Sequence, residues 1–196
     1  MRPNLARIIL PAATLLLLAT SGPASARSVY FSANFGPSFI GGPSFVTDYL
    51  LVNHGFTGDI AASFEFEDNF NLVVRLEYHR LPIDDTSVVG IHDAMQVWMI
   101  GSMLQYVFLD EEQTWRPFVG LGYSTADVGW ADDSPAEIET HFDNDDFRSV
   151  LQIGAGFQVR ANDWLRVIAE GRLVVISSPF NESSTTLYPI TIGVRF

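Results

Sequence analysis

The last ten residues of the sequence, 187–196, constrain the fold most strongly because their side chains alternate between two kinds. The apolar parity comprises Tyr188, Ile190, Ile192, Val194 and Phe196, and the opposite parity comprises Pro189, Thr191, Gly193 and Arg195. Successive side chains of a β-strand point to opposite faces, so this segment predicts a strand with one apolar face. Each such strand needs an apolar environment on one side only.

The same alternation recurs in earlier segments of the chain, at 28–39, 55–67, 70–79, 94–109, 115–124, 151–160 and 165–175. Short connections follow the second, fourth and sixth of these segments, and long ones follow the first, third, fifth and seventh. Alternation of short turns with longer loops is typical of transmembrane β-barrels. The sequence therefore predicts an all-β fold, an eight-stranded antiparallel up-and-down transmembrane β-barrel.

Charged side chains within these segments have the parity opposite to the apolar one. They are Asp59, Glu65, Glu67, Glu77 and Glu170 among the acids, and Arg75, Arg116, Arg160, Arg166, Arg172 and Arg195 among the bases. An arginine on the lipid face near the bilayer midplane costs about 2–4 kcal/mol, so a membrane barrel must exclude charge there. A soluble barrel has the reverse pattern, with apolar side chains inside. The pattern predicts apolar rows outside and a polar lumen.

Aromatic residues near the ends of the segments predict two girdles at the membrane interfaces. One girdle comprises Phe70, Phe108, Trp115 and Phe196, and the other comprises Tyr78, Trp98 and Tyr123. Trp164 has the lumen parity and does not fit either girdle, which places it in the turn after residue 160.

The first 26 residues have the pattern of a cleavable signal peptide. Arg2 and Arg7 precede an apolar run, and Ala24-Ser25-Ala26 is a small-residue cleavage site. The apolar run is too short for a membrane anchor. The predicted mature chain, 27–196, is one domain, and losing two arginines moves the formal net charge from −12 to −14. This acidity excludes nucleic acid as a partner, and the absence of cysteine excludes disulfides and thiol chemistry.

The topology and the terminal strand resemble small outer-membrane barrels of the OmpA/OmpX type. The resemblance implies insertion in the bacterial outer membrane, with both termini periplasmic and with outer-membrane lipid and lipopolysaccharide as surroundings. It also implies that Phe196 is part of the signal read by the barrel-insertion machinery. Unlike full-length OmpA, the sequence ends at Phe196 without a peptidoglycan-binding domain, so no tether to the cell wall is expected.

The lumen charges form the largest set of candidate functional residues. An eight-stranded barrel is just wide enough for side chains to fill it. Unpaired charges there would be costly, so we interpret the charged residues named above, together with His79, as a salt-bridged plug. The alternative is a small gated pore. A hydrophobic-compound channel resembling OmpW would need an apolar interior, whereas the predicted interior is charged.

Acidic residues also gather in the longest connection, 126–146. Asp132, Asp133, Asp143, Asp145 and Asp146 supply oxygen donors suited to divalent cations, but the spacing lacks a complete calcium-loop pattern. A solvated, self-repelling loop is the alternative, and Trp130, Ile138 and Phe142 would suit an adhesive tip. No cofactor is expected, and contact with an extracellular ligand is a further expectation.

Some eight-stranded barrels are enzymes that act on lipid A, so the histidines need consideration. They are His54, His79, His92 and His141. Hydrolysis would require one of them beside a serine and a carboxylate. His79 with Glu77 is the best pairing, yet both suit the plug, and the His-x-Ser-Asn motif associated with deacylation is absent. The sequence predicts a protein of structural or surface-interaction type without a catalytic site.

Overall fold

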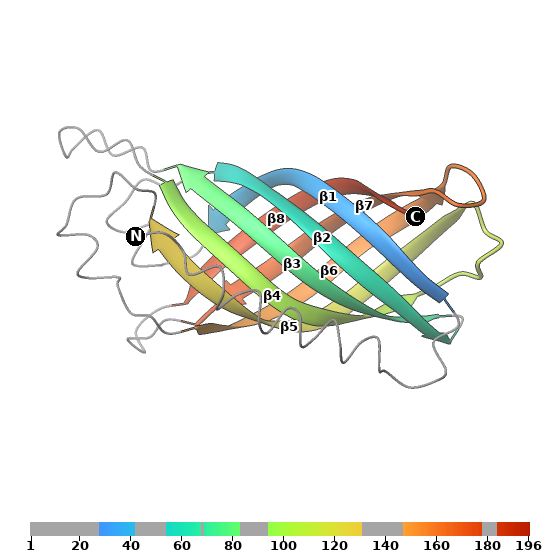
Figure 1. The fold of residues 1–196 in the computed structure, drawn as a ribbon, viewed down its shortest axis with the longest axis horizontal. Coiled ribbons are helices and arrows are strands. Elements are labelled where there is room, and N and C mark those ends of the chain that lie inside the picture. The colour runs from blue at the N-terminus through green and yellow to red at the C-terminus, as the bar shows by residue number, and fades with distance from the viewer. Residues whose placement is uncertain (1–27, 42–53, 68, 83–93, 131–146, 178–183) are drawn as a thin grey trace.

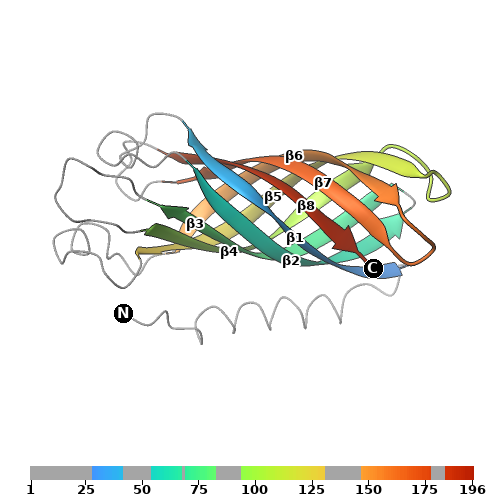
Figure 2. The same cartoon turned by 90° about the horizontal axis from the view of Figure 1, so that it is seen from above.

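A computed structural model of the chain describes residues 28–41, 54–67, 69–82, 94–130, 147–177 and 184–196. The strands close into a single antiparallel barrel in which each strand pairs with the next and the last pairs with the first (Figures 1 and 2). Their bounds are β1 (Ser28–Gly41), β2 (His54–Glu67), β3 (Phe70–Pro82), β4 (Ala94–Val107), β5 (Trp115–Trp130), β6 (Arg148–Arg160), β7 (Arg166–Ile176) and β8 (Thr185–Arg195). The predicted eight-stranded up-and-down barrel is confirmed. The predicted signal peptide, residues 1–26, lies outside the described ranges and stays a prediction.

The two ends of the barrel differ. At one end, which we call the turn end, short connections join β2 to β3, β4 to β5 and β6 to β7. At the other, the loop end, lie the strand ends that lead into residues 42–53, 83–93, 131–146 and 178–183. Within the described ranges, no helix is both long and apolar enough to cross a membrane.

Several strands extend further toward the loop end than the sequence predicts. Pro82 of β3 pairs with Ala94, and Met95 of β4 pairs with Trp130 of β5. The prediction ended these strands earlier because Pro82 and the acidic stretch after residue 126 are typical loop signals. Pairing with an adjacent strand overrides those local signals, since each added pair satisfies backbone groups that would otherwise need water.

Closure occurs between β1 and β8. Ser32 pairs with Arg195 and Phe39 pairs with Tyr188. At the end of β8, the Phe31 amide donates to the Phe196 carbonyl at 2.8 Å, and the Phe196 amide donates to the Phe31 carbonyl at 2.9 Å. The barrel therefore has no unpaired sheet edge, which a bilayer would not tolerate.

The outer surface carries the large apolar side chains. Phe35 is 68% exposed, Ile60 is 61% exposed and Leu121 is 58% exposed, whereas the neighbouring Asn34 and Asp59 are buried inside. This is the reverse of a soluble fold and matches the predicted faces. The surface is built for contact with lipid.

Aromatic rings cluster near both ends of the outer surface. At the turn end, the ring centroids of Phe70 and Phe108 each lie 5.1 Å from that of Tyr106. At the loop end, the Tyr78 ring lies 4.6 Å from Trp98 and 6.1 Å from Phe56. We call Phe56, Tyr78 and Trp98 the loop-end aromatic patch. Trp164 lies in the turn between β6 and β7, where it is 69% exposed.

The space around two glycines shows how tightly the barrel wall is packed at their positions. A Cβ on Gly193 of β8 would lie 2.1 Å from the Asn34 side-chain oxygen and 2.2 Å from the Ala33 carbonyl oxygen. A Cβ on Gly171 of β7, which points outward, meets nothing within 4 Å. We expect Gly193→Val to lower the free energy of unfolding by about 1–3 kcal/mol through overpacking at the closing strands.

The matched variant Gly171→Val should unfold like the wild type. Both can be measured by urea unfolding of the refolded protein in detergent micelles, followed by heat-modifiable gel mobility. Equal destabilisation by both substitutions would contradict the described packing at the β1–β8 closure.

Candidate functional site

The middle of the lumen holds a group of ionisable side chains from three strands, which we call the central charge cluster. Its members are Asp59 from β2, Arg75, Glu77 and His79 from β3, and Glu170 and Arg172 from β7. None of the six is more than 9% exposed. They point inward because inward positions alternate with lipid-facing ones along every strand.

Arg172 is the most connected member of the cluster. Its guanidinium donates to both carboxylate oxygens of Glu77, at 2.6 and 2.7 Å. The same guanidinium lies 3.7 Å from Asp59 and 3.6 Å from Glu170. A bidentate pair of this kind fixes both side chains in orientation as well as in distance. Arg172 therefore touches all three carboxylates of the cluster.

Arg75 makes the second set of ion pairs. Its Nη2 donates to Glu170 at 2.7 Å, and its Nε lies 3.5 Å from Asp59. The Asn34 side-chain amide donates to the same oxygen of Asp59, with its Nδ2 2.7 Å from Asp59 Oδ1. Each carboxylate of the cluster thus has at least one guanidinium within ion-pair distance, which offsets the cost of burying it.

His79 completes the cluster between a hydroxyl and a carboxylate. Its Nε2 lies 2.8 Å from Glu77 Oε1, and its Nδ1 lies 3.1 Å from Ser38 Oγ. Serine, imidazole and carboxylate in this order resemble the parts of a hydrolytic triad. However, Ser38 and His79 are both fully buried. The Glu77 carboxylate also binds Arg172, so these three residues fit a structural network inside the wall better than a nucleophile open to substrate.

A second charged group lies at the turn end of the lumen. Arg116 Nη1 lies 4.0 Å from Glu65 Oε1. The Arg195 guanidinium stacks over the Tyr30 ring, with its central carbon 3.9 Å from the ring centroid. Arg166 donates to a backbone carbonyl in the turn between β4 and β5 at 2.8 Å. The predicted plug is thus divided into two groups along the barrel axis.

Two predicted lumen residues do not join either group in the described structure. Arg160 lies at the rim of the turn end, where its guanidinium is 3.3 Å from Asp163 and more than a third of its side chain is exposed. Glu67 is the last residue of β2, and its side chain lies outside what the structure describes.

The lumen near the loop end is apolar, contrary to the predicted charged interior. Buried side chains that are each at most 2% exposed form this loop-end apolar layer, namely Leu81, Met95, Val97, Met99, Ala126, Val150, Val174, Ile176 and Leu187. The prediction was wrong for this layer for two reasons. Leu81, Ala126, Val150 and Ile176 lay beyond the predicted strand ends, whereas Met95, Val97, Met99, Val174 and Leu187 lay within predicted strands whose inward face was taken to be polar throughout. The layer covers the central charge cluster on the loop side.

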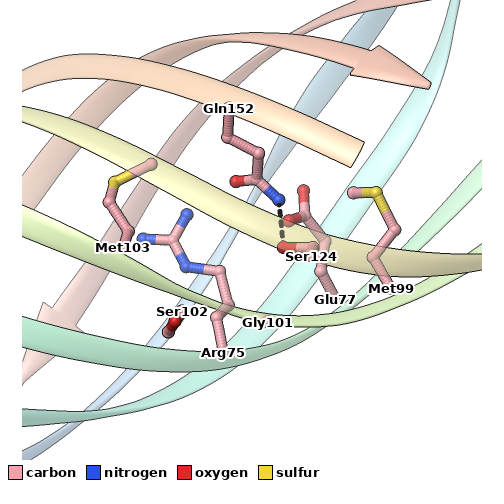
Figure 3. Close-up of a pocket in the computed structure, with 8 residues that line it drawn as sticks. All are labelled: Arg75, Glu77, Met99, Gly101, Ser102, Met103, Ser124 and Gln152. Carbon is pink, nitrogen blue, oxygen red and sulfur yellow. Dashed lines mark hydrogen bonds between the residues drawn. The ribbon is translucent and has the colours of Figure 1, made fainter. Parts of the chain in front are cut away.

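Small cavities lie between the packed side chains of the described lumen, and two of them adjoin the central charge cluster. One is lined by residues that include Arg75, Glu77 and Ser124, and Figure 3 shows Gln152 bonded to Ser124 beside it. The other lies toward the turn end, next to Asn34 and Glu170. Each measures about 10 Å³, room for about one water molecule. In the part of the lumen that the structure describes, these cavities do not provide a pore.

The remaining candidates from the sequence are placed differently. Asp132, Asp133, Asp143, Asp145 and Asp146 lie outside the described residues, as do His92 and His141. His54 begins β2 and is exposed at the loop end. Among the described residues, no group of three or more His, Asp or Glu side chains is arranged to hold a metal ion.

A sequence profile of the outer membrane protein β-barrel domain matches residues 12–196. The chain belongs to this family. Membership places it in the bacterial outer membrane, in agreement with the closed barrel and its apolar outer face. A comparison with curated proteins finds no match.

Solved structures of outer-membrane barrels share the fold of this family member. Neisserial surface protein A, NspA, is 17% identical with a TM-score of 0.62, and the match covers 85% of this chain and 95% of that one. OprG from Pseudomonas aeruginosa is 13% identical with a TM-score of 0.54, covering 86% and 96%. Ail of Yersinia pestis, solved in complex with the heparin analogue sucrose octasulfate, is 12% identical with a TM-score of 0.52, covering 86% and 97%.

Uncharged partners in this outer membrane β-barrel domain were missed at the sequence level. Ser38 contacts His79, Thr57 donates to Glu77 at 3.3 Å, and Gln152 accepts from Arg172 at 3.2 Å. Their inward parity was visible in the sequence. Which inward residue meets which depends on the stagger between strands, and the sequence did not supply that.

Proposed function

We propose that the chain is an integral outer-membrane protein of structural or surface-interaction type, with a lumen that stays closed. The filled lumen is the observation that carries the proposal. Ion pairs around Arg172 occupy the middle of the barrel, and the apolar layer occupies the loop end. Since the described part of the lumen offers no open path for solute, we assign the function to the surface of the barrel and to its loops.

The orientation follows from the connections between strands. Outer-membrane barrels have short turns on the periplasmic side and longer loops outside. This supports a barrel with both termini in the periplasm and with the loop end facing the cell exterior. Its partners are then the barrel-insertion machinery during assembly, and outer-membrane lipid and lipopolysaccharide afterwards. Residues 131–146 would present an acid-rich surface to cations or to a basic ligand.

Planar bilayers test the closed lumen directly. We expect the refolded wild-type protein to give no sustained single-channel steps, because ions would have to displace buried ion pairs and then wet an apolar constriction. Folding of the same preparation is checked by heat-modifiable gel mobility. Stable, reproducible conductance steps from folded protein would favour the gated pore instead.

A channel for small hydrophobic compounds is the second candidate, favoured by the loop-end apolar layer. Its side chains would accommodate an apolar solute entering from outside. The layer is packed, however, since Leu81, Val97 and Leu187 are fully buried. The central charge cluster lies directly below it, so an apolar solute would meet ion pairs on the axial route. This arrangement supports a seal more than a passage.

An enzyme acting on lipid A is the third candidate. The Ser38, His79 and Glu77 arrangement supplies the required residue types. Lipid A lies outside the barrel wall, whereas these side chains lie inside it and are sealed from solvent. Their burial supports a protein without catalytic activity.

A further inference from the structure

Arg80 differs from the other described arginines in the face of the barrel wall on which it lies. Within the strands that the structure describes, every arginine has the inward parity except Arg80 of β3, which is exposed on the outer face. It stands directly opposite Phe56 of β2, itself 52% exposed, and opposite Gln96 of β4. This outward position was not predicted, because the predicted third strand ended at residue 79.

The place of Arg80 along the barrel is marked by aromatic rings. Tyr78 precedes it on the same face, and the Tyr78 ring centroid lies 4.6 Å from that of Trp98 and 6.1 Å from that of Phe56. Aromatic residues of this kind mark the membrane interface. Two residues of a strand span about 6.7 Å, so Arg80 lies about that distance from Tyr78 toward the loop end. That is the level of the lipid head groups, where an outward charge is tolerated.

The guanidinium of Arg80 has no hydrogen bond or ion pair with any residue that the structure describes. The acid on the same outer face, Asp127 of β5, is two strands away and pairs across the sheet with Trp98. Arg148 of β6 lies close enough to Asp127 to interact with its charge. Arg80 is therefore available to an anion in the surrounding membrane.

We propose that Arg80 and the loop-end aromatic patch bind a phosphate group of lipopolysaccharide in the outer leaflet. Guanidinium matches phosphate in geometry because its parallel N–H groups donate to two oxygens at once. The Phe56 ring flanks Arg80, and the rings of Tyr78 and Trp98 lie one step deeper, at the level of the first acyl methylenes. The proposal rests on the orientation given under the proposed function, in which the loop end faces the cell exterior.

Native mass spectrometry of the refolded protein, released from detergent, tests this site. The probes are lipid A carrying both phosphates and the same lipid A after enzymatic removal of its phosphates. We expect Arg80→Gln to weaken binding of the phosphorylated probe about three- to fivefold, the range of an exposed ion pair. The dephosphorylated probe should bind wild type and variant alike. Arg160→Gln is the matched control, since it removes one partly exposed arginine at the opposite end.

Equal affinity of wild type and Arg80→Gln for the phosphorylated probe overturns the proposal. An equal loss in Arg160→Gln, or an equal loss for the dephosphorylated probe, overturns it too, since neither reflects a phosphate held at Arg80. Arg80→Lys provides a second variant that keeps the charge and should bind better than Arg80→Gln. The lipid A assay is made in detergent and does not depend on the conductance measurement, so a negative binding result would not contradict the closed lumen. Cleavage of the loops by protease on whole cells tests the orientation of the barrel separately.

Discussion

Arg172→Met is expected to lower the free energy of unfolding by about 3–5 kcal/mol, the largest loss of any single substitution in the lumen. The side chain volume is nearly kept, so the effect is electrostatic. Removing this guanidinium leaves the carboxylates of Asp59, Glu77 and Glu170 with Arg75 as the only remaining guanidinium of the central cluster. Urea unfolding in detergent micelles, followed by tryptophan fluorescence, measures the change.

Two further variants separate the loss of the ion pair from general damage. Arg172→Met combined with Glu77→Gln restores the charge balance of the cluster, and we expect it to recover at least half of the lost stability. Arg160→Met removes an arginine from the exposed rim and should change stability by less than about 0.5 kcal/mol. A double variant that is less stable than Arg172→Met alone would show that the cluster is not held by charge balance.

Leu76→Arg should destabilise the inserted barrel by about 2–4 kcal/mol, the cost of an arginine on the lipid face near the bilayer midplane. Leu76 lies on the outer face of β3, between Ile60 of β2 and Ile100 of β4. All three belong to the apolar row in the middle of the strands. Refolding into lipid vesicles, scored by heat-modifiable gel mobility, gives the folded fraction.

Leu76→Phe is the control for Leu76→Arg, because it is also larger than leucine but remains apolar. It should refold like the wild type. If the phenylalanine and arginine variants refold equally well, Leu76 does not face lipid, and the assignment of inner and outer faces fails with it.

Side-chain alternation was sufficient to predict the fold. Apolar residues of one parity recur in the predicted strands, and wherever a predicted strand carries charges they have the other parity. The structure buries Arg75, Glu77 and Arg172 inside the barrel. This success has a simple physical origin. Successive side chains of a strand point alternately to lipid and to the narrow lumen. The sequence must therefore alternate between residues that suit lipid and residues that suit the lumen.

The details of the lumen were less accessible to prediction. Part of the apolar layer was not predicted because Leu81 and Val150 were assigned to connections, and Arg80 was missed for the same reason. The rest, including Val97 and Val174, lay in predicted strands whose inward face was taken to be polar. Strand ends are set by pairing between neighbours, which local composition does not reveal. Contacts such as Arg172 with Glu77 join positions 95 residues apart, and they depend on the stagger of the whole barrel.

The bonds from Arg75 to Glu170 and from Arg172 to Glu77 both run between β3 and β7. In a ring of eight strands these two are diametrically opposed. The pairs therefore act as cross-braces that resist flattening of the cylinder. The cross-section of the barrel should therefore stay circular when the lateral pressure of the bilayer changes. The rim that carries the loops should then keep the same shape in different lipids.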